Sequence, residues 1–163
     1  MKPTELVGLL QECYRERLAM AERHKAVAVH VSDYDANNTY QYIINREETH
    51  LQWLQDALAD LSAPLPAASS PPSVTLDRSK DAWRAAATED AQKGRAFLAK
   101  WRPLVESLSH ARDQTMLRLM LGEVEEQTLL FEQAAAGQPD LLGRNGVGAG
   151  KRGLVAGARW IGD

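Results

Sequence analysis

Apolar residues recur at intervals of three and four along four long stretches of this chain. That spacing places side chains on one face of an α-helix and predicts amphipathic helices that share a core. The stretches extend from Pro3 to about His30, from a cap at Ser32-Asp33 to about Leu61, from about Asp77–Ser79 to about Leu108, and from a turn at 110–113 to about Ala136. We therefore expect an all-α four-helix bundle over residues 1–137.

A proline-rich linker at 62–76 separates the second helix from the third. Its four prolines exclude a helix and favour extended chain. At about 3.1 Å per residue the linker reaches roughly 45 Å, whereas a helix of about 28 residues is about 42 Å long. A crossover with the third helix parallel to the second is the prediction, and a loop confined to one end of the bundle is the alternative.

A carboxylate interrupts the apolar stripe of the second helix. Glu47 lies at the centre of that stripe and His50 at its edge, three residues on. Residues at this spacing are neighbours on a helix, so the pair could hold one metal ion together. A break of this kind in the binary pattern tends to mark function or a paired buried charge.

The other helices each offer a polar residue at or near their inward face. Counting from the predicted turns brings these residues to about the level of His50. The candidate metal ligands are Glu16, Glu47, His50, Asp90, Glu123 and Gln127. A set rich in oxygen with a single imidazole suits iron or manganese.

These features resemble the ferritin-like superfamily over about residues 4–136. They are Glu16, Glu47-x-x-His50 followed by Leu51-x-Trp53-Leu54, Asp90, and the long second connection. The resemblance implies a di-iron centre with oxidase or peroxidase-type chemistry or iron handling, and a homo-oligomer or a subunit of a larger complex. The chain departs from the family pattern because its fourth helix has no histidine and its third offers the shorter Asp90.

The alternative is a bundle that has lost its metal. Glu47 and His50 would then be a buried hydrogen-bonded pair that reaches Arg17 or Tyr40. Such a protein would be a structural or interaction subunit that docks to a larger partner through a glycine-rich, basic C-terminal tail, residues 138–163. The apolar anchors of that tail would be Leu154, Val155, Trp160 and Ile161.

Charge and composition further limit the functional classes that fit this chain. The formal net charge is −3, and residues 144–163 contribute four basic side chains and one acidic, so the rest carries −6. An acidic body argues against nucleic-acid binding. Cys13 is the single cysteine, which excludes a disulfide framework and a cysteine zinc site. With no apolar run of membrane-spanning length and no signal-peptide pattern, we expect a cytoplasmic protein without membrane insertion.

Overall fold

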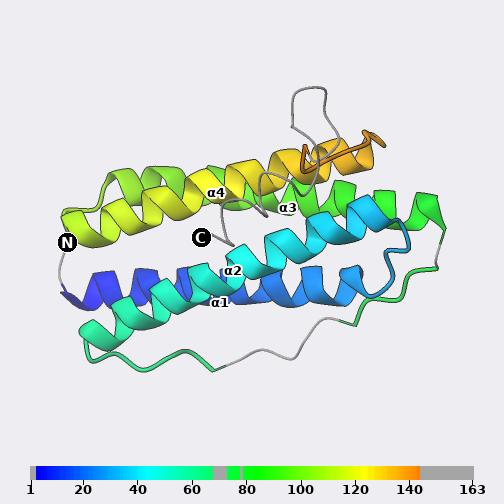
Figure 1. The fold of residues 1–163 in the computed structure, drawn as a ribbon. Coiled ribbons are helices and arrows are strands. Elements are labelled where there is room, and N and C mark those ends of the chain that lie inside the picture. The colour runs from blue at the N-terminus through cyan, green and yellow to red at the C-terminus, as the bar shows by residue number, and fades with distance from the viewer. Residues whose placement is uncertain (1–2, 68–72, 78, 144–163) are drawn as a thin grey trace, which may run out of the picture.

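The computed structural model describes residues 3–67, 73–77 and 79–143. Within these ranges the chain forms four α-helices and no strand: α1 (Pro3–Ala28), α2 (Tyr34–Asp60), α3 (Lys80–Glu106) and α4 (Ala111–Ala135) (Figure 1). The expected all-α four-helix bundle is thereby confirmed. In the described part of the chain, no helix combines the length and the apolar character that crossing a membrane requires.

Two helix starts follow from local capping. The Asp33 side chain accepts a hydrogen bond from the Ala36 amide at 3.0 Å, and the Ser79 hydroxyl accepts one from the Ala82 amide at 3.2 Å. Each cap satisfies a backbone donor that has no partner inside its helix. Pro103 lies inside α3, and the helix ends three residues after it, at Glu106.

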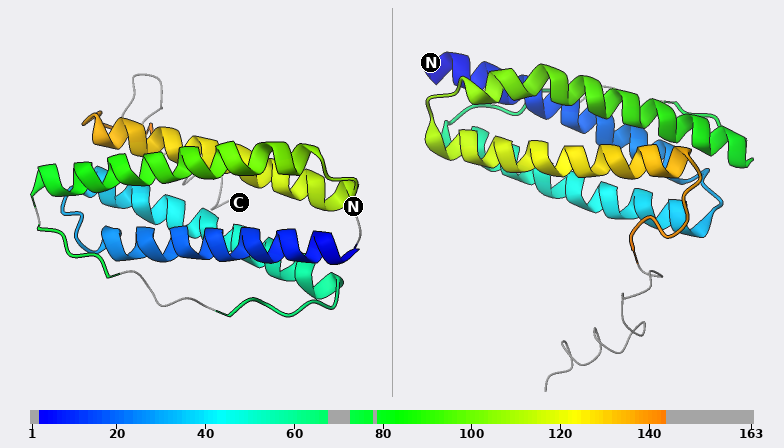
Figure 2. Two further views of the ribbon diagram at one scale, coloured as in Figure 1. Left: turned by 180° about the vertical axis from the view of Figure 1, so that it is seen from behind. Right: turned by 90° about the horizontal axis from the view of Figure 1, so that it is seen from above.

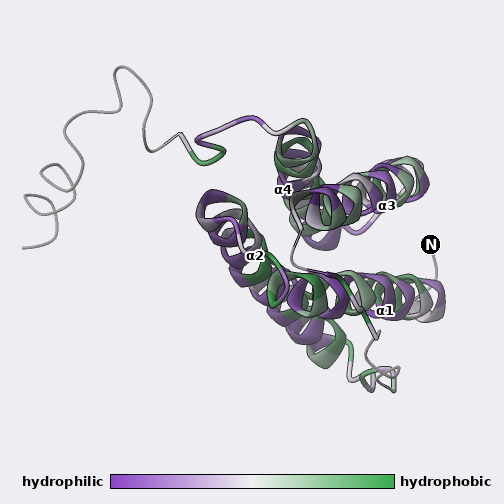
Figure 3. Ribbon diagram, turned by 90° about the vertical axis from the view of Figure 1, so that its right-hand side faces the viewer, coloured by the Kyte–Doolittle hydropathy of each residue, from purple (hydrophilic) through white to green (hydrophobic). Residues whose placement is uncertain are grey.

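The helices pack as two antiparallel pairs. Helix α1 packs mainly on α2, and α3 on α4, while the pairs meet through smaller α2–α4 and α1–α3 contacts (Figure 3). Two apolar clusters fill opposite ends of the bundle. One is built around Leu10, Leu54, Trp101 and Leu117, the other around Val27, Ile43, Trp83 and Phe131. Most of the buried polar side chains of the bundle lie between these two clusters.

The linker after α2 travels the length of the bundle. Near the start of α1, the Gln11 side chain donates to the Pro64 carbonyl at 2.8 Å. Just after the end of α1, a ring nitrogen of His30 lies 3.2 Å from the Val74 carbonyl oxygen. Helix α3 therefore begins at the end of the bundle where α2 began and runs parallel to it (Figures 1 and 2), which confirms the predicted crossover.

Candidate functional site

Polar side chains from all four helices meet between the two apolar clusters. We call this set the central polar cluster. Its members are Arg17, His24, Glu47, His50, Asp90, Glu123 and Gln127. All are buried except Glu123, whose side chain is 18% exposed. Charges so far from water require close partners, and the partners define what this layer can do.

Arg17 lies among the residues that were expected to bind metal. Its Nη2 is 3.1 Å from Glu47 Oε1, 3.2 Å from His50 Nδ1 and 3.4 Å from Gln127 Oε1. Burial lowers the pKa of the guanidinium, and the Glu47 carboxylate opposes that effect. The contact between Glu47 and Arg17 is one that the metal-free alternative anticipated.

The two neighbours of His50 determine its tautomer. Its Nε2 lies 2.7 Å from Glu123 Oε2, and because a carboxylate only accepts, Nε2 carries the hydrogen. Arg17 only donates, so Nδ1 holds the lone pair. Burial, together with the charge of Arg17, lowers the pKa of His50 to about 4. His50 is therefore neutral, and Arg17 already uses its lone pair.

Glu47 is held from the other side by His24. The Nδ1 of His24 lies 3.0 Å from both carboxylate oxygens, so it acts as donor. Burial by itself would raise the pKa of Glu47, but His24, Arg17 and His50 together bring that pKa below its usual value. Glu47 is thus an ionised group that ties α1 to α2.

Asp90 forms a second centre within the cluster. The Tyr40 hydroxyl donates to its Oδ2 at 2.7 Å, and Arg23 Nε donates to its Oδ1 at 2.5 Å. Burial and the Asp90 carboxylate both raise the pKa of Tyr40, which keeps the hydroxyl protonated. His24 Nε2 lies 3.9 Å from Asp90 Oδ1 and has no hydrogen-bond partner among the residues that the structure describes. Tyr40, which the metal-free alternative offered as a partner of Glu47 or His50, binds Asp90 instead.

Glu123 closes the cluster toward solvent. Arg46 binds it through two nitrogens, with Nε 2.9 Å from Oε2, and His50 donates to the same oxygen. Burial alone would raise the pKa of Glu123, and the hydrogen bonds from Arg46 and His50 lower it. This acid was expected as a metal ligand and serves here as an ion-pair partner.

Glu16 lies outside the cluster. Its side chain is 34% exposed, accepts from Trp101 Nε1 at 2.8 Å and pairs with Lys100. The next residue, Arg17, points into the layer instead, in register with the buried Cys13 and Ala21 on either side of it. The i, i+4 spacing of these three residues is the signal that could have identified Arg17 from the sequence.

The predicted ligands do not fit a di-iron centre in this arrangement. Arg17 contacts Glu47, His50 and Gln127, while Asp90 is engaged by Tyr40 and Arg23. Glu16 faces the α3 surface. Over residues 3–67, 73–77 and 79–143, no three His, Cys, Asp or Glu side chains are arranged to hold a metal ion. Binding of iron or manganese stays a prediction for metal analysis to test.

Comparisons with known proteins found no relative of this chain. No family model matches it, and neither the curated proteins nor the solved structures contain a match. The function of this chain must therefore be inferred from the geometry of the central polar cluster itself.

Proposed function

We propose that this chain is a ferritin-like bundle in which a guanidinium takes the place of the metal, and that it works as a non-catalytic interaction subunit. The observation that carries the proposal is the position of Arg17, whose Nη2 contacts Glu47, His50 and Gln127. A guanidinium neutralises a carboxylate as a metal ion would. It offers no open coordination position at which dioxygen or peroxide could react.

The charge balance of the cluster supports this proposal. Each carboxylate has its own guanidinium: Arg17 on Glu47, Arg23 on Asp90 and Arg46 on Glu123. A metal centre of the ferritin type needs carboxylates whose charge the metal ions balance. Here the three negative charges are already compensated by side chains, so the layer is electrically complete without a cation from solution.

The ferritin-like part of the proposal is supported by topology. The crossover that makes α3 parallel to α2 and the central position of Glu47-x-x-His50 are both consistent with that superfamily. Partner binding through Leu154, Val155, Trp160 and Ile161 completes the proposal. Those four residues lie outside the described part of the chain.

Metal analysis tests the first half. Wild-type protein and Glu47→Ala are titrated anaerobically with Fe(II), exposed to air, desalted and analysed for iron, and the experiment is repeated with Mn(II). We expect no stoichiometric metal in either protein and the same melting temperature with metal or chelator. Stoichiometric iron that is retained by wild type and by the surface control Glu12→Ala, but lost in Glu47→Ala, would overturn the proposal and favour the di-iron enzyme.

A deletion tests the second half. Full-length protein and a variant ending at Gln138 are purified from the native host under identical conditions, and associated proteins are identified. Loss of one defined partner with the deletion is the expected result. Unchanged association would show that residues 139–163 are not the docking segment.

A further inference from the structure

One exposed line of side chains on α4 takes no part in the central polar cluster. Arg112, Leu119 and Glu126 follow one another at intervals of seven residues, and seven residues bring an α-helix to within about 20° of two full turns. We call these three residues the α4 stripe. All three are exposed, Arg112 by 74% and Leu119 by 56%. The stripe is therefore apolar at its centre, basic toward the start of α4 and acidic toward its end.

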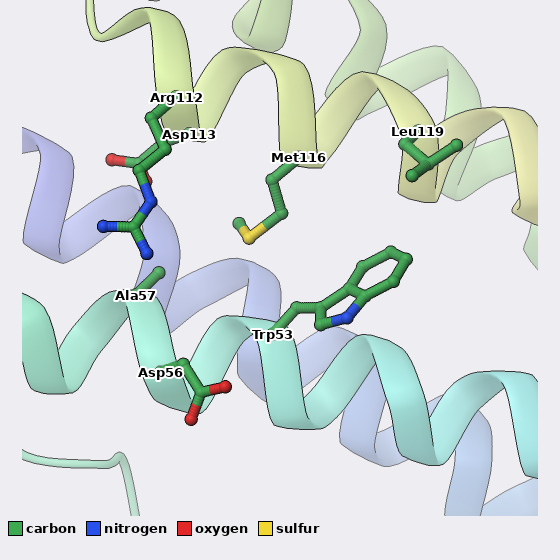
Figure 4. Close-up of a pocket in the computed structure, with 7 residues that line it drawn as sticks. All are labelled: Trp53, Asp56, Ala57, Arg112, Asp113, Met116 and Leu119. Atoms are coloured by element: carbon green, nitrogen blue, oxygen red, sulfur yellow. The ribbon is translucent and has the colours of Figure 1, made fainter.

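A groove between α2 and α4 adjoins the centre of the stripe. Its volume is about 270 Å³, and Arg112 and Leu119 are among its lining residues. The Trp53 ring from α2 and the Met116 side chain from α4 extend into the space between the helices (Figure 4). Tryptophan and methionine are enriched in the buried centres of protein interfaces. The groove and the stripe together form one surface with an apolar centre, which is a candidate contact site for another protein.

We propose that this surface binds the same surface of a second copy of the chain. In the dimer the two α4 helices lie antiparallel, with Leu119 of each copy at the two-fold axis. The inference goes beyond the proposed function, since it concerns the outer face of α4 and is independent of whether the central polar cluster holds a metal.

The order of charges along the stripe favours a second copy as the partner. In an antiparallel pair centred on residue 119, position 112 of one helix faces position 126 of the other. Arg112 of each copy therefore meets Glu126 of the other copy, and the two-fold symmetry forms this ion pair twice. A parallel pair would instead place arginine beside arginine and glutamate beside glutamate. The stripe is thus complementary to itself only in the antiparallel arrangement.

Both charged groups can pair between copies without losing their contacts within the chain. Arg112 Nη1 lies 2.6 Å from Asp60 Oδ2, and a guanidinium has five N–H donors, so Arg112 can hold a second carboxylate as well. Exposed Glu126 accepts a hydrogen bond at 3.4 Å from the Tyr42 hydroxyl, which is a neutral donor. Its two oxygens have lone pairs for a guanidinium from the second copy.

The shape of α4 beside Leu119 also suits a second helix. In the same register, Met116 of one copy faces Gly122 of the other. A Cβ at Gly122 would meet no heavy atom of the described residues within 4 Å, so this position leaves room for the long Met116 side chain. A large side chain therefore faces an open position on each side of the two-fold axis.

The length of the contact indicates how tightly the copies bind. From residue 112 to residue 126 is about 21 Å at 1.5 Å per residue. A strip of this length along one helix and the adjoining groove is at the small end of specific interfaces, and contacts of that size form transient complexes. We therefore expect a dimer that dissociates on dilution, with a dissociation constant of about 10–100 µM.

Analytical ultracentrifugation of the full chain tests the charge pairing. Wild type, Arg112→Glu, Glu126→Arg and the double variant are compared at low salt, where exposed ion pairs are screened least. Either single reversal places like charges opposite each other at both symmetric positions, so each should raise the dissociation constant at least about fivefold. The double variant exchanges the two charges and should return the constant to within about twofold of the wild-type value.

Cysteine crosslinking tests the register. Cys13 is the single native cysteine and is fully buried, so Leu119→Cys supplies the accessible thiol. At the two-fold axis, two such thiols can form a disulfide, which requires Cα atoms about 4.4–6.8 Å apart. The control is Leu129→Cys on the same helix, where the two thiols would lie about 30 Å apart along the helix axes. After mild oxidation we expect at least about fivefold more disulfide-linked dimer from position 119 than from position 129.

Unchanged helical circular dichroism shows that each variant folds, since every substitution changes an exposed residue. Three results would overturn the inference. The first is wild-type protein that stays monomeric at about 500 µM. The second is a double charge variant that does not recover the dimer, and the third is an equal disulfide yield from positions 119 and 129.

Discussion

Arg17 and His50 determine each other's role: Arg17 Nη2 lies 3.2 Å from His50 Nδ1. The guanidinium can only donate, so the imidazole must present its lone pair to Arg17 and its hydrogen to Glu123. The nitrogen that could have bound a metal is therefore committed to a side chain. This pair is the contact that most directly supports the proposal that a guanidinium takes the place of a metal in this bundle.

Removing Arg17 should destabilise the fold strongly. In Arg17→Met, Glu47 keeps His24 but loses its guanidinium, and an uncompensated buried charge costs about 3–5 kcal/mol. Urea unfolding measures the loss. Lys100→Met removes a surface cation that pairs with Glu12 and Glu16, and should cost about 1 kcal/mol or less.

A double-mutant cycle separates pairing from packing. If the ion pair matters, Arg17→Met combined with Glu47→Leu should lose at least about 1 kcal/mol less than the sum of the two single losses. Additive losses would show that Arg17 and Glu47 stabilise the bundle independently of each other.

Stability should fall as the pH drops from about 6.5 to 4. The pKa of His50 is about 4 in the folded protein against an ordinary 6.5, so in this window the unfolded chain takes up a proton that the folded protein does not. At about 1.4 kcal/mol per pKa unit, the loss approaches about 3 kcal/mol. Below pH 4.5, protonation of Glu47 and Glu123, whose pKa values are lowered in the folded state, adds a further loss.

The measurement is urea unfolding at pH 7, 5.5 and 4.5 for wild type, His50→Gln and His110→Gln. His50→Gln should flatten the dependence between pH 6.5 and 4.5. His110, whose side chain is 55% exposed and pairs with Asp113, provides a second histidine variant for comparison, and the change in slope should be larger in His50→Gln than in His110→Gln. An unchanged slope in His50→Gln would contradict the assignment of this dependence to His50.

Gly94 allows α3 and α4 to approach closely. A Cβ at this position would lie 2.2 Å from the Thr128 hydroxyl oxygen, so Gly94→Ala forces the helices apart. We expect a loss of about 1–3 kcal/mol, partly recovered by adding Thr128→Ala. Gly122 on α4 has open space, so Gly122→Ala should stabilise by about 1 kcal/mol through helix propensity. Thermal unfolding of the wild type, Gly94→Ala, Gly94→Ala with Thr128→Ala, and Gly122→Ala measures whether each change destabilises or stabilises the protein.

The Tyr40 hydroxyl stabilises a carboxylate that water cannot reach. Tyr40→Phe leaves Asp90 with Arg23 alone and should cost about 1–3 kcal/mol. Tyr42→Phe removes a longer, exposed hydrogen bond to Glu126 and should change stability by about 0.5 kcal/mol or less. Equal effects in chemical denaturation would contradict a special role for Tyr40.

The sequence by itself determined the helices and their connection. Apolar periodicity located all four, Asp33 and Ser79 marked two starts, and the length of the proline-rich linker predicted the crossover. The sequence also placed Glu47 on an inward face. Each residue turns a helix by about 100°, so Glu47 shares a face with apolar residues that are buried.

Only the tertiary structure decided which polar groups meet. Periodicity gives the direction in which a side chain points, but its level along a neighbouring helix depends on crossing angles and on where each turn ends. An error of one residue there replaces Arg17 with Glu16 and turns an ion pair into an apparent metal ligand. The same sensitivity explains why neither the contact between His24 and Glu47 nor the hydrogen bond from Tyr40 to Asp90 could be predicted from the sequence. Charge pairing between helices is set by distances of a few ångström, and those distances exist only once the bundle is packed.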